Sequence, residues 1–220
     1  MKVLVFDTET TGLPLSYNAA LTDSAKWPHI VQLSFILYDT DEKIVLDYSD
    51  YIIQIPPEVV ISPESIAIHQ ITPERCKYEG IPIRQALNAF EKNLEDADLI
   101  VGHNLLFDKR MLMVELLRHN MKNFLYKDGS RFPEYCTMKS TTELCGLPAY
   151  NNKTGYKYPK LTELHEHLFH TTPKGVHNAM VDVLVCLRCY VFHVHQHDIA
   201  TDPSVQETLR GLYASYCQCL

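Results

Sequence analysis

Three strand-like runs occupy the first 54 residues of the chain, and helical spacing begins only after them. Each run is rich in apolar and β-branched residues, and polar turns separate one run from the next. The runs span residues 2–7, 30–38 and 43–54. Because short turns and a polar loop are the only links between them, we expect these strands to form an antiparallel meander at the start of a sheet.

The rest of the chain alternates helical segments with short apolar runs. Prolines 63 and 73 sit where short helices can begin, and later segments carry apolar residues at helical spacing. Helices are expected over 63–70, 73–80, 83–95, about 105–119, 160–169 and 178–196, with short strands at 97–104 and 135–138. A meander followed by alternating strands and helices predicts an α/β fold with a mixed sheet.

Composition fits one globular domain with a sizeable core. The 220 residues are 46% hydrophobic and 21% charged, so general disorder is not expected. We expect a domain over residues 1–200 and a helical tail over 201–220. No stretch reaches the roughly 18 apolar residues that span a bilayer, and the seven cysteines suggest a reducing compartment. The expectation is a soluble, intracellular protein, cytoplasmic or nuclear, without membrane contact.

Net charge limits how such a chain can bind nucleic acid. The formal charge is −7 with the histidines neutral. That value argues against a bulk electrostatic grip on phosphates, but it leaves room for a local basic groove or a contact through metal ions.

Acidic residues occur where three of the expected elements begin or end. Asp7 and Glu9 leave the first strand two residues apart, so they project to the same side. Asp108 follows the strand at 97–104, and Asn104 is placed to cap the helix that carries it. Asp182 lies in the first turn of the late helix. Ends of strands and starts of helices meet along one edge in α/β sheets, so the four acids can converge.

His177 precedes Asp182 by five residues. If both were helical, they would point about 140° apart. For both to face one site, His177 must lie in the loop before the helix. A histidine there suits proton transfer, because histidine side chains titrate near neutral pH.

Four converging carboxylates repel one another and raise each other's pKa. Two divalent cations would remove that conflict, and a ligand set made only of oxygen favours Mg²⁺ or Mn²⁺. Two such ions can stabilise the attacking and leaving oxygens of an in-line phosphoryl displacement.

Three segments in this order resemble the exonuclease motifs of the DnaQ-like, DEDDh 3′→5′ exonucleases, which include polymerase proofreading domains. They are FDTETTGL, GHNLLFD and HNAMVD, separated by about a hundred and then about seventy residues. The resemblance covers roughly residues 2–195. It implies a ribonuclease H-like fold, in which a mixed five-stranded sheet is flanked by helices.

The resemblance also implies a role for each matching residue. Asp7, Glu9, Asp108 and Asp182 would bind the two cations, and His177 would deprotonate the attacking water. Residues beside the terminal nucleotide would be Thr8, Thr10, Thr11 and Leu13. His69 would line the nucleotide pocket, and Asn104 and Phe107 would position the second motif and the terminal sugar. The implied reaction releases nucleoside 5′-monophosphates from the 3′ end of single-stranded or frayed nucleic acid.

Other readings stay open at this level. His69 is equally consistent with a satisfied, partly buried side chain. The stretch at 153–160 interleaves lysine and tyrosine as single-strand binders do, although an ordinary solvated loop is the simpler interpretation. His193, His195 and His197 alternate along the chain and are expected to face solvent.

The substrate is the least constrained part of the prediction. Single-stranded DNA ends are preferred, with a polymerase or a replication or repair factor as a partner. The alternatives are an enzyme that trims RNA 3′ ends and a vestigial module that binds nucleic acid or docks on a polymerase. The loop at 14–29 matches no family motif.

Overall fold

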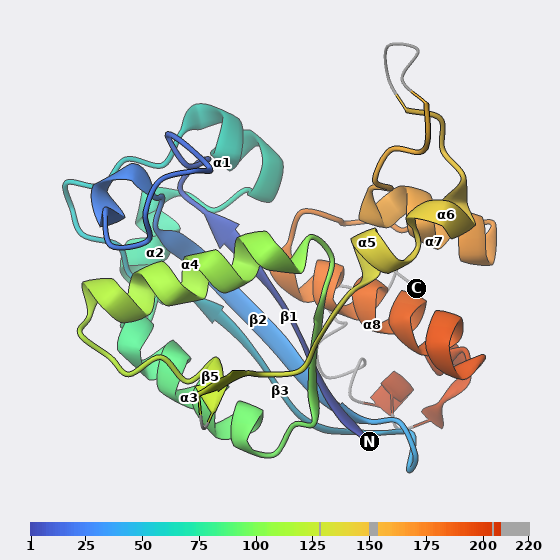
Figure 1. Cartoon of the computed structure of the whole chain (residues 1–220). Helices are drawn as coiled ribbons and strands as arrows, with labels where there is room; N and C mark the ends of the chain where they lie inside the picture. Colours follow the sequence, from blue (N-terminus) through green and yellow to red (C-terminus); the bar gives the residue numbers. More distant parts are fainter. Residues whose placement is uncertain (128, 150–153, 204, 208–220) are drawn as a thin grey trace.

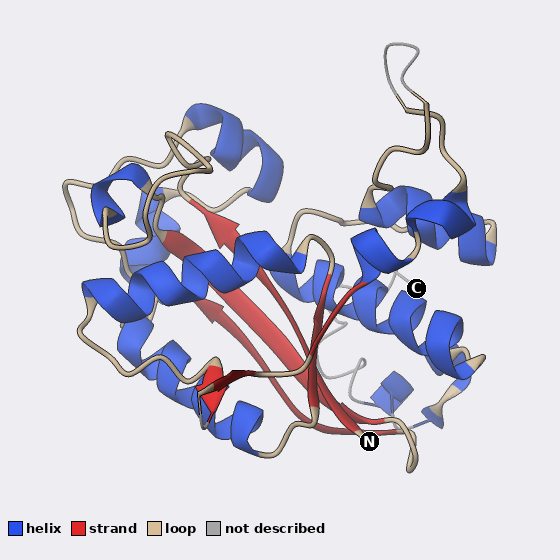
Figure 2. Cartoon of the chain, in the orientation of Figure 1, coloured by secondary structure: helices blue, strands red, loops and turns tan. Residues whose placement is uncertain are grey.

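The computed structural model describes residues 1–127, 129–149, 154–203 and 205–207. Its centre is a five-stranded sheet in the order β3-β2-β1-β4-β7 (Figures 1 and 2). The strands are β1 (Lys2–Thr10), β2 (Ile30–Asp39), β3 (Ile44–Ile52), β4 (Leu99–Gly102) and β7 (Glu134–Cys136). β1, β2 and β3 pair antiparallel, whereas β4 and β7 run parallel to β1. The predicted mixed sheet is confirmed.

Helices cover both faces of the sheet, and β1 shows how the sequence divides between them. Val3 and Val5 belong to the core cluster under α8 (Ala179–His195) and α7 (Leu161–Phe169). Leu4 and Phe6 belong to the cluster under α3 (Ile83–Glu95) and α4 (Leu105–Arg118), which cross the opposite face in Figure 1. Residues 3–6 are all buried, since alternate side chains enter the two cores, whereas Asp7 and Glu9 are half-buried.

The two proline-initiated helices form where they are expected. α1 (Pro63–His69) begins after Ser62, whose hydroxyl accepts a hydrogen bond from the Ser65 N–H at 3.1 Å. α2 (Pro73–Glu79) begins after Thr72, which caps it in the same way. Each cap satisfies an amide that the first turn leaves without a helical partner.

Several short elements were not predicted. They are the 3₁₀ turns at Ser24–Lys26 (η1) and Ile199–Thr201 (η2), a hairpin of β5 (Tyr126–Lys127) and β6 (Ser130–Arg131), and the helices α5 (Thr137–Ser140) and α6 (Thr142–Cys145). The strand expected at 135–138 is wrong in its second half, because α5 already begins at Thr137. β1 runs on to Thr10, three residues beyond the expected end.

The late part of the chain corrects one prediction about histidines. His197 is half-buried, and its Nε2 lies 2.8 Å from an Asp202 carboxylate oxygen. Asp202 also accepts a hydrogen bond from Tyr38, which anchors this segment beside β2. His193, on α8, is half-buried as well, and of these three histidines His195 is exposed as expected. Most of the helical tail expected at 201–220 lies outside the described residues.

In the part of the chain that the structure describes, no helix has the length and apolar character needed to cross a membrane.

Candidate active site

β1 carries two acids beyond the point where its neighbour β4 ends. The last residue of β4 is Gly102, and Val101 pairs with Val5, so Asp7 and Glu9 extend past the shorter strand. Both acids continue the alternation of Val3 and Val5 and therefore face α8. Carboxylate oxygens of Asp7 and Glu9 lie within 4.8 Å of each other, which confirms that the two side chains project to the same side.

α8 brings the third acid of the cluster. Asn178 caps this helix, and its side-chain oxygen accepts a hydrogen bond from the Met180 N–H at 3.1 Å. Asp182 then lies in the first turn, facing β1. Asp7, Glu9 and Asp182 each offer a carboxylate oxygen within 4.8 Å of the other two.

Asp108 approaches β1 from the opposite face. It is buried in the first turn of α4, and its Oδ1 accepts hydrogen bonds from the hydroxyl and the backbone N–H of Thr8, at 2.7 and 3.1 Å. The alternation of β1 explains this pairing, because Thr8 follows Leu4 and Phe6 toward α4. The Thr8 hydroxyl is thus directed at Asp108.

Asn104 precedes α4 in the predicted N-cap position, but its side chain accepts no hydrogen bond from the helix. Its backbone is left-handed, with φ 61°. An effective N-cap normally has extended backbone torsions, so the amide is not aimed at the first turn. The prediction of a side-chain cap is wrong, and Asn104 is exposed.

The electrostatics of the cluster are those of acids held together without a counter-charge. Burial, followed by the charges of the neighbouring acids, raises the pKa of Asp7 well above its usual value and that of Glu9 to about 8. Burial raises the pKa of Asp108 to about 7, against the lowering effect of the bonds from Thr8. It raises the pKa of Asp182 to about 7, against the backbone N–H of His177.

These carboxylates fit divalent cations. The donors are oxygen atoms only, they lie close together, and their ionised forms repel one another without a positive charge between them. Hard cations such as Mg²⁺ and Mn²⁺ prefer such ligands.

His177 lies in the loop before α8, as the spacing requires. Its backbone has φ 71°, and its N–H donates to an Asp182 carboxylate oxygen at 3.1 Å. The ring is exposed and makes no hydrogen bond or ion pair with the described residues. A hydrogen bond on the backbone alone fixes where the residue stands and leaves the ring free to turn.

His69 is the most tightly bound of the predicted pocket residues. It is buried, its Nδ1 accepts the Ile71 N–H at 3.0 Å, and its Nε2 lies 3.2 Å from the carbonyl oxygen of Thr10. Accepting at Nδ1 leaves Nε2 as the donor to Thr10, and burial lowers the pKa of the ring. The structure therefore places His69 behind the β1 terminus.

Leu13 and Phe107 differ in exposure. Leu13 is 73% exposed, and Phe107 is half-buried against the α3 and α4 core. Thr10 and Thr11 are buried, and the Thr10 hydroxyl donates to the Gly12 carbonyl at 2.7 Å. A cleft of about 600 Å³ opens beside Thr11 and Leu13, and Ser62, Ser65 and Ile68 of the α1 region line it as well.

Two residues that position the site were not predicted from sequence. Gln32 of β2 is buried, and its side-chain oxygen accepts the Ala179 N–H at 3.2 Å, which ties the sheet to the start of α8. His103 contacts the Thr137 hydroxyl and the Pro159 carbonyl, each at 3.0 Å. Each bond joins residues 30 or more apart in sequence, and no local pattern signals such a contact.

The tyrosine- and lysine-rich stretch is partly described. Tyr156 and Tyr158 are exposed, whereas Lys157 forms an ion pair with Glu163. Residues 150–153 lie outside the described part.

The fold and the carboxylate cluster together define a class, that of DnaQ-like exonucleases with a ribonuclease H-like fold. The chain belongs to the RNase_T exonuclease family, whose model matches residues 4–190.

Among known proteins, the chain is 30% identical over 121 residues to a PolC-type DNA polymerase III of Pediococcus pentosaceus, a match that covers 55% of this chain and 7% of the polymerase. The fold is similar to that of E. coli exonuclease I in complex with a dT13 oligonucleotide, with a TM-score of 0.65, 15% identity and coverage of 95% of this chain and 43% of that one.

It is also similar to exonuclease X in complex with 5′ overhanging duplex DNA, with a TM-score of 0.53, 20% identity and coverage of 90% of this chain and 95% of that one. The chain thus spans less than half the length of exonuclease I and a small part of the polymerase.

Proposed function

We propose that this chain is a metal-dependent 3′→5′ exonuclease that acts on single-stranded or frayed DNA ends and releases nucleoside 5′-monophosphates. The observation that carries the proposal is the cluster of Asp7, Glu9 and Asp182, joined from the other face by Asp108. Family membership supports hydrolysis of nucleic acid from an end.

The four acids are the proposed ligands for two Mg²⁺ or Mn²⁺ ions. Bound there, such ions would stabilise the attacking and leaving oxygens of an in-line displacement at phosphorus. Asp7 is the proposed shared ligand, because the charges of Asp182 on α8 and of Asp108 on α4 both act on it. Thr8 orients Asp108, a different role from the substrate contact expected from sequence.

His177 is the proposed general base. The backbone bond to Asp182 holds the residue beside the acids, and the exposed ring can turn toward a water molecule there. A general base must come within hydrogen-bond reach of the proton that it removes, and that approach often tightens only when substrate is bound.

The proposed place of the terminal nucleotide is the cleft between Leu13 and α1. Leu13 would pack against the base, while His69 holds the Thr10 backbone at the floor. Asn104 and Phe107, at the start of α4, are the proposed residues that position the second motif and the terminal sugar. The terminal nucleotide must be unpaired to enter this cleft. Because a mismatched end frays at a lower free-energy cost than a paired end, it should be degraded faster.

DNA is proposed ahead of RNA because the oligonucleotides named with the structural relatives are DNA. A polymerase is proposed as a partner on the strength of the PolC-type match. The proposed extent of the catalytic domain is residues 1–200.

The test uses 5′-labelled DNA and RNA of one sequence, incubated with Mg²⁺, Mn²⁺ or EDTA. The wild-type chain should shorten the DNA from its 3′ end, and EDTA or Asp7→Asn should abolish the ladder. Asp96→Asn, which changes an acid at the end of α3, is the matched control and should be fully active. Faster cutting of RNA would assign the trimming activity instead, and no ladder with any metal would favour the vestigial module.

A further inference from the structure

The loop at 14–29, which matched no family motif, lies against α4 and is bonded to it along its length. Leu15 N–H donates to the Lys26 carbonyl at 2.9 Å, which brings the two ends of the loop together. Arg110 of α4 donates to the Tyr17 carbonyl at 3.0 Å. The Thr11 N–H donates to the His29 carbonyl at 2.9 Å, and the His29 N–H donates to the Thr11 hydroxyl oxygen at 3.0 Å. These two bonds join the loop to the end of β1.

Arg118, in the last turn of α4, makes the largest number of these bonds. Its guanidinium donates to the carbonyls of Ser24 and Pro28, both at 2.7 Å, and to that of Trp27. All three acceptors lie within residues 24–28. Two guanidinium nitrogens share the work, since one bonds Pro28 and Glu115 and the other bonds Ser24 and Trp27. An ammonium group carries its three donors on a single nitrogen, which cannot occupy both positions.

Glu115 orients the Arg118 guanidinium through a hydrogen bond. It lies one turn earlier on α4, is only 2% exposed, and its Oε1 accepts a hydrogen bond from Arg118 at 2.6 Å. His29 lies 3.6 Å from the same oxygen, but burial lowers its pKa to about 4, so its ring is neutral at pH 7. Arg118 is therefore the hydrogen-bonded cation beside the buried Glu115 carboxylate, and His119 lies 3.6 Å from its other oxygen.

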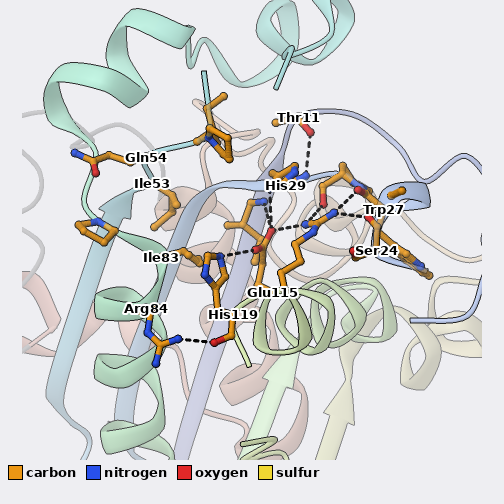
Figure 3. A pocket seen from close by; sticks show the side chains of 17 residues that line it. Thr11, Ser24, Trp27, His29, Ile53, Gln54, Ile83, Arg84, Glu115 and His119 are labelled. Carbon is orange, nitrogen blue, oxygen red and sulfur yellow. Dashed lines mark hydrogen bonds and ion pairs between the residues drawn. The ribbon is translucent and has the colours of Figure 1, made fainter. Parts of the chain in front are cut away.

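The segment held in this way separates two hollows. Behind it is a cavity of about 740 Å³, where Figure 3 shows Glu115, His29 and His119 converging. In front of it is the cleft of about 600 Å³ beside Leu13. Ala25, Trp27 and Pro28 line both hollows.

The cleft adjoins the carboxylate cluster along the chain. Its first lining residue, Thr11, is two positions beyond Glu9, or about 7 Å along an extended strand. Residues 25–28 line this cleft together with residues of the α1 region. Whatever fixes residues 24–28 therefore sets the width of the cleft.

We propose that Arg118 is a positioning residue for substrate, which fixes residues 24–28 as a wall against the terminal nucleotide. The inference rests on the proposed function and adds a determinant of nucleotide binding outside the three motifs. Arg118 contacts none of the four proposed metal ligands and does not line the cleft. We therefore expect it to act on substrate binding, through residues 24–28, and not on the chemical step.

The experiment compares Arg118→Lys with Arg84→Lys. Lysine keeps a positive charge beside Glu115, but its single nitrogen cannot replace both guanidinium nitrogens that bond the carbonyls of residues 24–28. Arg84 lines the same cavity, and its guanidinium bonds the His119 carbonyl at the end of α4 and not the loop. Three quantities are measured: kcat and KM on single-stranded DNA, hydrolysis of bis(p-nitrophenyl) phosphate, which has no nucleoside, and the rate of tryptic cleavage after the exposed Lys26.

For Arg118→Lys, KM for DNA should rise about tenfold, since two or three modest hydrogen bonds are lost. Its kcat and its hydrolysis of the nucleoside-free ester should match the wild type, cleavage after Lys26 should be faster, and Arg84→Lys should behave as wild type throughout. Retained ester hydrolysis also shows that the variant is folded.

An unchanged KM with faster cleavage after Lys26 would overturn the inference, because the loop would then be loose without consequence for substrate. Unchanged cleavage would overturn it as well, as would a parallel loss of ester hydrolysis or equal effects of both variants. A wild-type chain inactive on every substrate would instead overturn the proposed function, and the inference with it.

Discussion

At the scale of single residues, β1 explains the site by alternation. Odd-numbered residues face α8 and even-numbered residues face α4, so one strand supplies acids to one side and the Thr8 donors to the other. The sequence was sufficient to predict that Asp7 and Glu9 share a side. It was not sufficient to predict that Thr8 bonds Asp108, because the two residues are 100 positions apart and meet only through the packing of α4.

Replacing Thr8 tests this division. Thr8→Val keeps the shape of the side chain but removes the hydroxyl that bonds the buried Asp108, so the free energy of unfolding should fall by about 1–3 kcal/mol. Urea denaturation in EDTA measures the change. Thr8→Ser, which keeps a hydroxyl, is the control and should lose less than half as much, and equal losses in the two variants would argue against the bond.

His177 should matter for the chemical step and little for folding. Its ring is exposed and forms no hydrogen bond with described residues, so His177→Ala should leave the unfolding transition unchanged. Loss of a general base should lower kcat on single-stranded DNA by a factor of about 10² to 10⁴, with KM nearly constant. His167→Ala removes another exposed histidine, on α7, and should have full activity. A drop in kcat below tenfold for His177→Ala would assign the base to another group.

At the scale of elements, the long periodic segments were predictable and the short ones were not. Helix α3 has the predicted bounds, because its apolar spacing is strong over thirteen residues. Helices α5 and α6 have four residues each, too few for any periodic pattern, and they form because Thr137 and Thr141 bond back to preceding carbonyls. The bonds from Arg110 and Arg118 to the loop at 14–29 could not be predicted either, because they depend on how α4 packs against that loop.

The start of α8 is the element boundary on which the site depends most. Asn178 caps this helix one turn before Asp182, and its oxygen also lies 3.5 Å from the Gln32 amide. Asn178→Ala should lower the free energy of unfolding by about 1 kcal/mol, the usual cost of a lost N-cap. Asn178→Ser, which can still cap, should recover most of that loss in chemical denaturation. Equal stability of the alanine variant and the wild type would show that the cap contributes nothing.

At the scale of the whole molecule, the sheet order follows from rules that a sequence can satisfy in few ways. A short turn can join only antiparallel neighbours such as β2 and β3, whereas parallel neighbours such as β4 and β7 need a longer connection, which here includes α4. The layers therefore could be predicted, whereas the exact approach of Asp108 could not. The same layers hold four acids close together at one edge, and the free energy of unfolding should depend on their protonation.

The sign of that dependence follows from the raised pKa values. Glu9 titrates at about 8 and Asp108 and Asp182 at about 7 in the folded chain, whereas exposed carboxyls titrate near 4. Between those limits the folded state holds more protons than the unfolded state. The contribution of these acids to stability is therefore complete near pH 4 and below, and it is lost progressively as the pH rises to 8. A divalent cation removes the repulsion and restores the lost stability.

The most direct test of the cation site is the thermal unfolding midpoint between pH 5 and 8, in EDTA and in excess Mn²⁺, for the wild type and for Asp7→Asn. We predict a midpoint in EDTA that falls as the pH rises, and a Mn²⁺-induced increase that is larger at pH 8 than at pH 5. Asp7→Asn should show a shallower fall and a smaller response to Mn²⁺. A midpoint that rises with pH in EDTA, or that Mn²⁺ leaves unchanged at pH 8, would contradict the assignment of these four acids as a divalent-cation site.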